Sequence, residues 1–482
     1  MNIVQLISEE TRNCVHKTAM VQGTQSISYC ELFSRIDTLR EILSRREINT
    51  GQRIAFRCSD GIDYVVGALA LLACGAAVVP VADSLTASEV SETIERIDVS
   101  GILAHASLPA VAGDETAEKI DELFHWRARR SDPELNQRCR DMGAAFIRFS
   151  SGTTGASKGV VISHRSIVDR TDAANQGLAI SEKDVILWVL GMSHHFVVSI
   201  LLFLRKGATI VVANHGFPFS VIEAAQKVQP TFIYGSPVHF HLMAMSKALA
   251  PQALANVRMA ISTSMKMPPD VYARFKSKFN LAPSEAYGII EIGLPCINTD
   301  ADVAGAASVG RILPDYQVRI VRADQDGIGE VLMQGRGMFD AYFSPWRLRE
   351  ECLEEGWFHT GDLGRIDEQG RLCLLGRSKT VIVCAGMKVF PEEVEEVINS
   401  VTGVKESLVS GKDHPQFGQA PIAQVVLHGN VSDPAAVIET LRAHCRKCLS
   451  SYKVPVEFRE VNSVPKTVSG KLLRSPVAAA PT

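Results

Sequence analysis

The stretch FIRFSSGTTGASKGVVISH at residues 146–164 decides how the rest of the chain is interpreted. An extended run leads into a loop of serine, threonine and glycine, which is followed by Lys158 and a second extended run. Glycines let backbone N–H groups approach a phosphate, while hydroxyl groups and a lysine add donors and charge. The spacing is not that of a Walker A loop, because Gly159 and not Ser or Thr follows the lysine. The segment predicts a phosphate-binding turn, with a flexible surface turn as the alternative.

On both sides of this loop, helical and extended patterns alternate. Residues 30–45 carry apolar side chains at helical spacing, and residues 53–60 have the pattern of a strand. Residues 63–81 predict a buried helix, a stop at Gly75 and a buried strand. Similar alternations follow at 185–190, 208–213, 221–228 and 231–235. This order favours an α/β fold with a mostly parallel sheet.

The pattern of predicted elements changes after about residue 303. Short strands with glycine and aspartate turns predict a small antiparallel β unit. Pro391 and the glutamates after it suit the first turn of a helix, and a second helix is expected near 434–449. The predicted fold class is therefore α/β. It comprises a large N-terminal domain of α/β sheet subdomains plus a small β unit, followed by a small α+β C-terminal domain.

Composition narrows the functional class. Hydrophobic residues make up 46% of the chain, charged residues 21%, and the formal net charge is −3. This balance disfavours a nucleic-acid binder, which would show a basic excess. The apolar run at 197–204 is far shorter than the ~20 residues of a membrane span. We expect a cytoplasmic protein with reduced thiols, because no signal peptide is visible and the eleven cysteines are scattered.

Four further motifs follow the loop in order: AYGIIEIG (286–293), GWFHTGDLG (356–364), LLGRSKTVIVCAG (374–386) and PKTVSGKLLR (465–474). Together the five segments resemble the adenylate-forming superfamily of acyl-CoA and aryl-CoA ligases, peptide-synthetase adenylation domains and beetle luciferases. Their style is most similar to stand-alone acyl or aryl acid ligases. The resemblance implies that ATP and Mg²⁺ activate a carboxylic acid as acyl-AMP. The acyl group then passes to a thiol of CoA or of a carrier-protein phosphopantetheine.

The resemblance also implies a nucleotide site. Its members are Ser150, Ser151, Gly152, Thr153, Thr154, Gly155, Lys158, Tyr287, Gly288, Glu291, Asp362, Arg377 and Lys471. Glu291 would ligate Mg²⁺, Asp362 would accept hydrogen bonds from the ribose, and Lys471 would bridge the acid and the α-phosphate. The catalytic residues implied are Lys471, Glu291 and His194.

An acid pocket is implied in the same way. Its residues are Trp188, His194, Phe196, Tyr234, Gly235, Ser236, Val238, Thr263, Tyr287 and Gly288. Most are apolar or aromatic, which favours an aliphatic or aryl acid. No carboxylate stands at 190–196 to pair with an α-ammonium, so a free α-amino acid is not expected. Either His194 or His195 would gate the pocket, and the second of the pair is expected to be structural.

Family members usually rotate their C-terminal domain between the two half-reactions, and the pivot corresponds to Lys379. We therefore expect an N-terminal adenylation core at 1–376, a hinge at 377–380 and a mobile C-terminal domain at 381–482. No carrier domain is appended, so a carrier protein would act in trans. CoA is slightly favoured as acceptor by the style of the terminal motif.

The chain departs from the family pattern at two places. Ile290 replaces a threonine that normally meets the AMP phosphate, and Thr263 and Ser264 replace glycines beside the adenine. A catalytically weakened or non-turning-over acyl- or nucleotide-binding homologue is therefore the alternative. A P-loop phosphotransferase is disfavoured by the missing G-K-S/T sequence, and a luciferase-like oxidase would share the first half-reaction.

Overall fold

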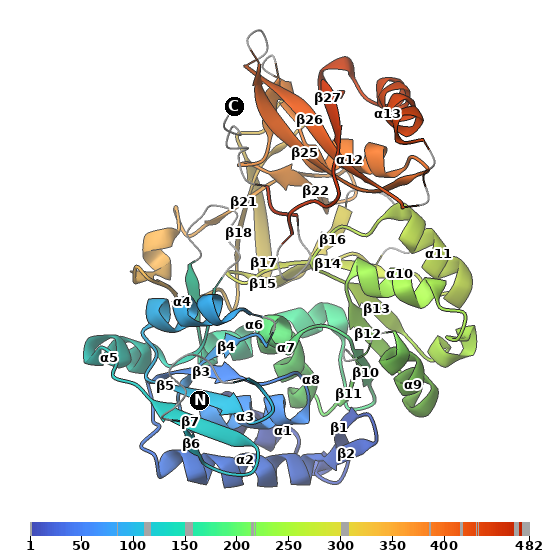
Figure 1. Ribbon diagram of the computed structural model, residues 1–482. Helices are drawn as coiled ribbons and strands as arrows, with labels where there is room; N and C mark the ends of the chain where they lie inside the picture. Colours follow the sequence, from blue (N-terminus) through green and yellow to red (C-terminus); the bar gives the residue numbers. More distant parts are fainter. Residues whose placement is uncertain are drawn as a thin grey trace. The chain divides into compact units, whose positions relative to one another are not determined.

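The structure is a computed structural model (Figure 1). It describes residues 2–83, 85–109, 117–149, 158–213, 216, 218–299, 308–384, 387–414, 418–429, 431, 433–466 and 472–474. These residues form two compact units. The first holds the described residues up to Gln317 together with Gln334–Gly356, and the second holds Val318–Met333 and the described residues from Trp357 onward. The boundaries expected at 377–380 stay a prediction.

One sheet of the first unit has nine strands. Their order is β20 (Arg347–Leu348), β19 (Ala341–Phe343), β9 (Gly159–Ser163), β8 (Ala144–Phe149), β4 (Ala77–Val81), β3 (Arg53–Arg57), β5 (Gly101–His105), β7 (Phe124–Ala128) and β6 (Glu118–Lys119). The centre is parallel, with β3 between β4 and β5. Strands β8 and β9 are antiparallel and correspond to the two extended runs that flank the predicted phosphate loop.

A second sheet of this unit runs in the order β16 (Ser308–Ile312), β15 (Gly293–Ile297), β14 (Ser284–Ile289), β13 (Met259–Ser262), β12 (Phe232–Gly235), β10 (Val185–Trp188), β11 (Thr209–Val212), β1 (Thr18–Gln22) and β2 (Gln25–Ser28). Strands β10 to β14 and β1 pair in parallel, whereas β14 and β15 form an antiparallel hairpin. The carboxyl ends of the parallel strands therefore meet at one edge, which is where α/β sheets place their ligands.

Helices cover these sheets. They are α1 (Ile3–Glu10), α2 (Tyr29–Ser44), α3 (Ile62–Ala73), α4 (Ala87–Ile97), α5 (Pro133–Met142), α6 (His164–Leu178), α7 (Met192–His195), α8 (Leu201–Arg205), α9 (Phe219–Val228), α10 (Pro237–Met245) and α11 (Pro269–Phe279). Helices α9 to α11 pack on one face of β10, β12 and β13 (Figure 1). A π-helical turn, Phe196–Ile200, joins α7 to α8, whose Phe203 packs on the other face. Helix α2 begins with a capping box between Ser28 and Glu31.

The second unit contains strands β17 (Tyr316–Val321) and β18 (Gly329–Gly335), which begin or end at its boundary, and the hairpin of β21 (Phe358–Ile366) and β22 (Arg371–Arg377). Another sheet follows, built from β23 (Ile382–Cys384), β24 (Met387–Val389), β25 (Val404–His414), β26 (Gly418–Leu427) and β27 (Glu457–Glu460). Helices α12 (Pro391–Asn399) and α13 (Pro434–Cys448) pack with it around one apolar core. Both helices lie where the sequence predicts them.

This architecture confirms the predicted α/β class with a small α+β part at the C-terminal end. The apolar run at 197–204 belongs to the π-helical turn and α8, and nearly all of its side chains are buried in the first unit. Within the described ranges no helix is long and apolar enough to cross a bilayer. The eleven cysteines, all inside those ranges, are free thiols.

Candidate functional site

Glu291 lies in the tight turn between β14 and β15. The turn closes with the N–H of Ile292, which donates to the carbonyl of Ile289 at 3.1 Å. Two glycines allow the hairpin to be this tight. A Cβ on Gly288 would lie 2.5 Å from the carbonyl oxygen of Gly293, and Gly293 itself has a φ of +115°. The family motif therefore corresponds to a rigid hairpin that presents one carboxylate.

The carboxylate of Glu291 contacts a residue that the sequence did not indicate. The Tyr342 hydroxyl donates to Glu291 Oε1 at 3.1 Å. Tyr342 lies on β19, beside β9, and the Lys158 ammonium is 4.7 Å from the centre of its ring. Burial and the neighbouring Glu291 raise the pKa of Tyr342, so the phenol keeps its proton. The motif of Glu291 and the motif of Lys158 are distant in sequence, and both contact Tyr342.

Arg170 on α6 stabilises the turn that carries Glu291. Its guanidinium is almost fully buried and donates to the carbonyls of Ile290 at 3.1 Å and Gly337 at 2.9 Å. The N–H of Phe339 donates to the carbonyl of Glu291 at 2.8 Å. Residue 290, where the family threonine is missing, therefore still contributes its backbone to the site.

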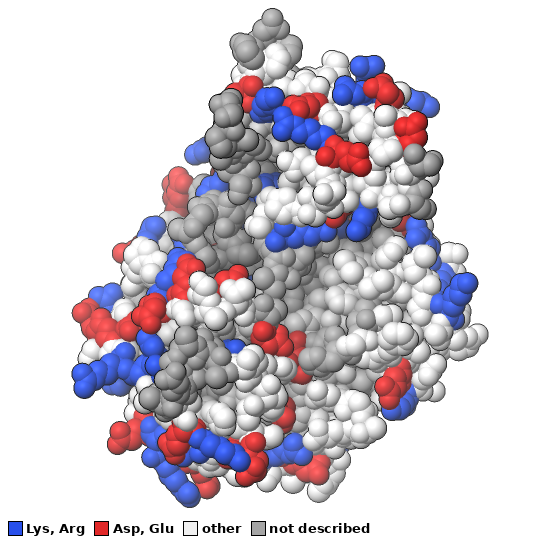
Figure 2. All heavy atoms as spheres, viewed as in Figure 1, with Lys and Arg blue, Asp and Glu red and all other residues white. Residues whose placement is uncertain are grey.

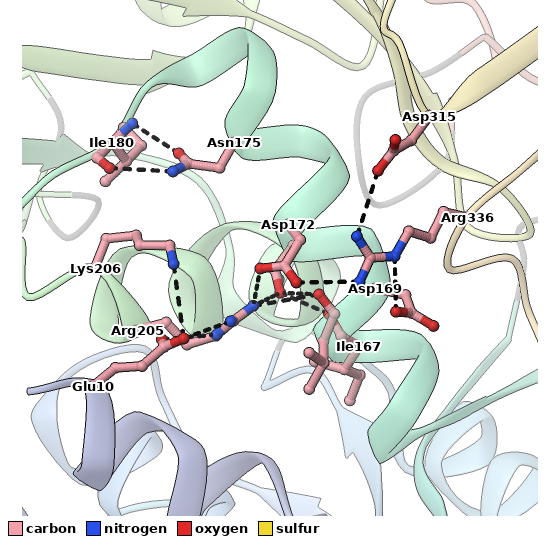
Figure 3. Close-up of polar contacts among 12 residues, drawn as sticks. Glu10, Ile167, Asp169, Asp172, Asn175, Ile180, Arg205, Lys206, Asp315 and Arg336 are labelled. Carbon is pink, nitrogen blue, oxygen red and sulfur yellow. Dashed lines mark hydrogen bonds and ion pairs between the residues drawn. The ribbon is translucent and has the colours of Figure 1, made fainter.

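The segment that carries Tyr342 is tied to α6 by charges. Arg336 contacts Asp169 at 2.9 Å, Asp172 at 3.4 Å and Asp315 at 3.6 Å, and its side chain lies among these carboxylates (Figure 3). Further along, Asp340 accepts the Ser163 N–H at 2.6 Å. These contacts hold the segment that carries Tyr342 against β9 and α6.

Arg148, near the end of β8, is a second residue that the motifs did not single out. It donates to the backbone carbonyl of His194. Burial lowers the pKa of Arg148 to about 10, and the negative charge of Glu291 opposes that shift. The guanidinium therefore stays charged at neutral pH. Its place in the extended run before the predicted phosphate loop was the available signal.

Three of the predicted acid-pocket residues form an aromatic and hydroxyl cluster. The rings of Trp188 and Tyr234 stack with centroids 5.7 Å apart, and His195 lies edge-on at 6.3 and 6.4 Å from them. The buried hydroxyl of Tyr234 shares hydrogen bonds with Ser199 of the π-helical turn and with Thr263. The indole N–H of Trp188 is buried and finds no hydrogen-bond partner among the described residues.

The two histidines of α7 have different surroundings. His195 packs on the aromatic cluster, whereas the His194 ring shares a hydrogen bond with Ser193 at 2.9 Å and its carbonyl accepts from Arg148. The N–H of Met192 donates to Asp60 at 2.9 Å. A carboxylate from another loop therefore does reach this segment, where it caps the helix. Which histidine gates the pocket stays open.

Other predicted pocket residues are distributed around this cluster. Phe196 is buried and packs on Phe146 and Tyr64. The hydroxyl of Ser236 shares a hydrogen bond with His239 at 2.8 Å. Val238 is 54% exposed on α10, where the surface is largely uncharged (Figure 2).

Nearer the hairpin, the Gly235 carbonyl accepts the Thr263 N–H at 3.0 Å. Tyr287 and Gly288 follow on β14, and Thr263 Oγ1 lies 3.5 Å from the carbonyl of Ala286 on the same strand. Ser264 has a φ of +77°, a conformation that favours glycine. Ser264 therefore has a backbone conformation that a glycine would adopt with less strain.

In the second unit, Asp362 and Arg377 are cross-strand partners on β21 and β22. Asp362 is buried, and its carboxylate lies 2.9 Å from Arg377 Nε. The backbone N–H of Asp362 donates to Thr360 Oγ1 at 3.0 Å, and the Thr360 hydroxyl donates to the carbonyl of Val331. The structure therefore brings two of the predicted nucleotide residues together in a fixed geometry.

Lys379, the predicted pivot, is exposed in the turn that follows β22. The turn is closed by the N–H groups of Thr380 and Val381, which both donate to the Arg377 carbonyl. A Cβ on Gly376, just before it, would lie 2.8 Å from the carboxylate of Glu392. The pivot role of Lys379 stays a prediction.

Several predicted positions lie outside the described residues: Ser150, Ser151, Gly152, Thr153, Thr154, Gly155 and Lys471. The chain next to Lys471 is described. Leu472 forms an antiparallel bridge with Lys466, and Arg474 binds both carboxylate oxygens of Glu395 at 2.6 and 2.7 Å. This bidentate pair anchors the C-terminal segment in the second unit.

The donor chemistry of the Glu291 turn fits a hard divalent cation. Across the residues that the structure describes, no group of three or more His, Cys, Asp or Glu side chains could hold a metal by itself. A single carboxylate is nevertheless what Mg²⁺ commonly uses, since it keeps waters and shares phosphate oxygens.

Two family models match the chain. The model of AMP-binding enzymes covers residues 8–343, and that of the AMP-binding enzyme C-terminal domain covers residues 393–471. The chain belongs to the AMP-binding enzyme family. It is thus a member of the adenylate-forming superfamily, and its relatives include acid–CoA ligases.

Individual relatives agree with this placement. An octahydro-indenyl propanoyl:CoA ligase of Rhodococcus jostii is 27% identical, with 95% of this chain and 94% of that protein aligned. A feruloyl-CoA synthase of an Amycolatopsis species is 26% identical, with 96% and 95% covered. Among solved structures, the O-succinylbenzoate CoA synthetase of Bacillus subtilis has a TM-score of 0.83 at 22% identity, with 98% of both chains covered. That likeness shows that this AMP-binding enzyme shares its fold.

Proposed function

We propose that this enzyme joins a carboxylic acid to ATP, releasing pyrophosphate and forming an acyl-AMP. A thiol then attacks the acyl carbon, and AMP leaves as the thioester forms. The acid is aliphatic or aryl, and it is not a free α-amino acid. The observation that carries the proposal is the meeting of Glu291 and Lys158 around Tyr342 in a chain of the acid–CoA ligase family.

The phosphate side of the reaction needs positive charge. Attack on the α-phosphate gathers negative charge on phosphate oxygens, and preorganised cations lower that barrier. Lys158 supplies one cation next to the predicted phosphate loop. Glu291 would hold Mg²⁺, which screens the phosphate oxygens when it is bound.

The ribose and the reacting carboxylate are assigned to residues beyond the first motif. Asp362 would accept hydrogen bonds from two ribose hydroxyls, and Arg377 Nε lies 2.9 Å from its carboxylate. Lys471 bridges the acid carboxylate and the α-phosphate, because a compact ammonium offers three donors.

The wall of the acid pocket supports a ring-bearing or aliphatic acid. Trp188 and Tyr234 supply stacked aromatic surface, and the nearby Asp60 carboxylate already caps α7. An acceptor atom on the acid that reached this depth would pair the buried Trp188 indole N–H. Two relatives are a feruloyl-CoA synthase and a ligase of a fused-ring propanoate, which agrees with this class of acid.

The thiol acceptor is CoA or a carrier-protein phosphopantetheine acting in trans. We favour CoA because the relatives that cover nearly the whole chain include CoA ligases. The cytoplasmic location stays a prediction.

Product analysis tests this proposal. With Mg²⁺, ATP, CoA and a matching acid, the enzyme should form AMP, pyrophosphate and acyl-CoA in equal amounts. The Lys471→Ala variant should lower acyl-AMP formation by roughly 100-fold or more while ATP still binds. Unchanged turnover in that variant, or release of ADP, would contradict the assignment. ATP binding without turnover of any acid by the wild-type enzyme would favour the weakened homologue.

A further inference from the structure

The contact between Tyr342 and Glu291 has a role beyond packing. We propose that Tyr342 is a positioning residue, which holds the Glu291 carboxylate in the orientation that binds a divalent cation. The inference rests on the proposed function, in which Glu291 meets Mg²⁺ beside ATP. Neither the family motifs nor the sequence patterns singled out this tyrosine.

The geometry of the hydrogen bond carries the inference. The Tyr342 hydroxyl donates to Glu291 Oε1 at 3.1 Å. A carboxylate has two oxygens with about four lone-pair directions, so a hydrogen bond to one oxygen restricts its orientation without using its full capacity to bind other groups. Outer partners that orient a ligand in this way commonly set the affinity for the metal.

Tyr342 is itself held in place. Its side chain is 8% exposed, and the ring packs on Phe339 with centroids 4.8 Å apart. Its backbone is in register with Val160 of β9, two residues past Lys158. The tyrosine hydroxyl therefore has little freedom to leave the carboxylate.

The chain on both sides of the contact is anchored to α6. Arg170 bonds the carbonyls of Gly337 and Ile290, so one side chain connects the segment of Tyr342 to the turn of Glu291. Arg336, which is 46% exposed, adds ion pairs to Asp169 and Asp172 of α6 (Figure 3). These bonds fix the distance between hydroxyl and carboxylate.

The experiment measures the dependence of ATP affinity on Mg²⁺, by calorimetric titration of the full chain at a series of Mg²⁺ concentrations. In Tyr342→Phe the ring stays and only the hydroxyl is lost. The Mg²⁺ concentration that produces half of the full change in ATP affinity should rise about 10- to 100-fold. ATP affinity without the metal should stay at the wild-type value. In Glu291→Gln the effect of Mg²⁺ should disappear.

Tyr272→Phe is the matched control. Tyr272 is also 8% exposed and lies under a lysine, with Lys276 Nζ 5.7 Å from its ring centre, but it belongs to α11. It should titrate like the wild type.

A Tyr342→Phe variant that melts earlier with an unchanged Mg²⁺ midpoint would overturn the inference, as would a Glu291→Gln variant that keeps the Mg²⁺ effect. If the ATP affinity of the wild-type enzyme does not change with Mg²⁺ concentration and no acid supports catalysis, the proposed function itself is wrong.

Discussion

At the scale of single residues, Asp362 shows how the protein positions the side chain proposed to bind the ribose. The carboxylate is buried, lies 2.9 Å from Arg377 Nε and is positioned by the backbone bond to Thr360. The proposed ribose contact would therefore be positioned before a nucleotide binds.

We predict that Asp362→Asn weakens ATP binding roughly 10- to 100-fold, because hydrogen bonds to a charged group contribute about 1.5–3 kcal/mol. Calorimetric titration with ATP measures the change. Asp367→Asn is the control, since it removes a similar ion pair, with Arg371 at 2.7 Å, at the turn of the same hairpin. Equal losses in both variants would show that the hairpin, and not the ribose contact, was damaged.

Residues inside motifs were predictable, and residues that reach the site from elsewhere were not. Glu291 and Asp362 are read directly from local sequence. Tyr342 lies 51 positions from Glu291 and carries no motif of its own, so only the pairing of β19 with β9 reveals it. Arg148 and Arg170 were missed for the same reason, because their partners are backbone carbonyls that no sequence pattern marks.

At the scale of elements, two arginines from other segments of the first unit bind carboxylates on α6. Arg205, at the end of α8, binds Glu10 of α1 at 2.7 Å and Asp172 of α6 at 2.9 Å, and it is 3% exposed. Arg336 contacts the same Asp172 but is 46% exposed (Figure 3). The two arginines therefore bind one carboxylate in different surroundings.

We predict that Arg205→Met lowers the free energy of unfolding of the first unit by roughly 1.5–3 kcal/mol, because the buried guanidinium loses its bonds to Glu10, Asp172 and Thr171. Arg336→Met should cost less than about 1 kcal/mol, as exposed pairs do. Chemical denaturation followed by tryptophan fluorescence compares the two. Equal costs would mean that burial does not set the strength of these pairs.

Periodicity predicted several of the elements and failed where it is absent. Helices α2, α3, α12 and α13 and strands β3, β4 and β10 lie where apolar spacing places them. The π-helical turn Phe196–Ile200 was not predicted, because the run 197–204 is apolar at every position except Ser199 and so carries no period. That turn brings Ser199 to Tyr234, a contact that the acid-pocket residues alone did not suggest.

At the scale of the whole molecule, two family models cover residues 8–343 and 393–471, and each of the two compact units carries predicted nucleotide residues. Glu291 and Lys158 belong to the first unit, and Asp362 and Arg377 to the second. The order of motifs did not predict this grouping, because the core expected at 1–376 includes Asp362, and the expected boundaries stay a prediction. The identity of the acid was not predictable, because the proposed pocket includes residues such as Trp188 and Tyr234 whose packing no motif specifies.

Acid-dependent ATP–pyrophosphate exchange tests the central claim most directly. The wild-type enzyme is assayed with Mg²⁺ across aliphatic acids, aryl acids and free α-amino acids. We predict exchange with at least one aliphatic or aryl acid, none with α-amino acids, and none when Mg²⁺ is removed. Release of inorganic phosphate without pyrophosphate exchange, or exchange that needs no acid, would contradict the account.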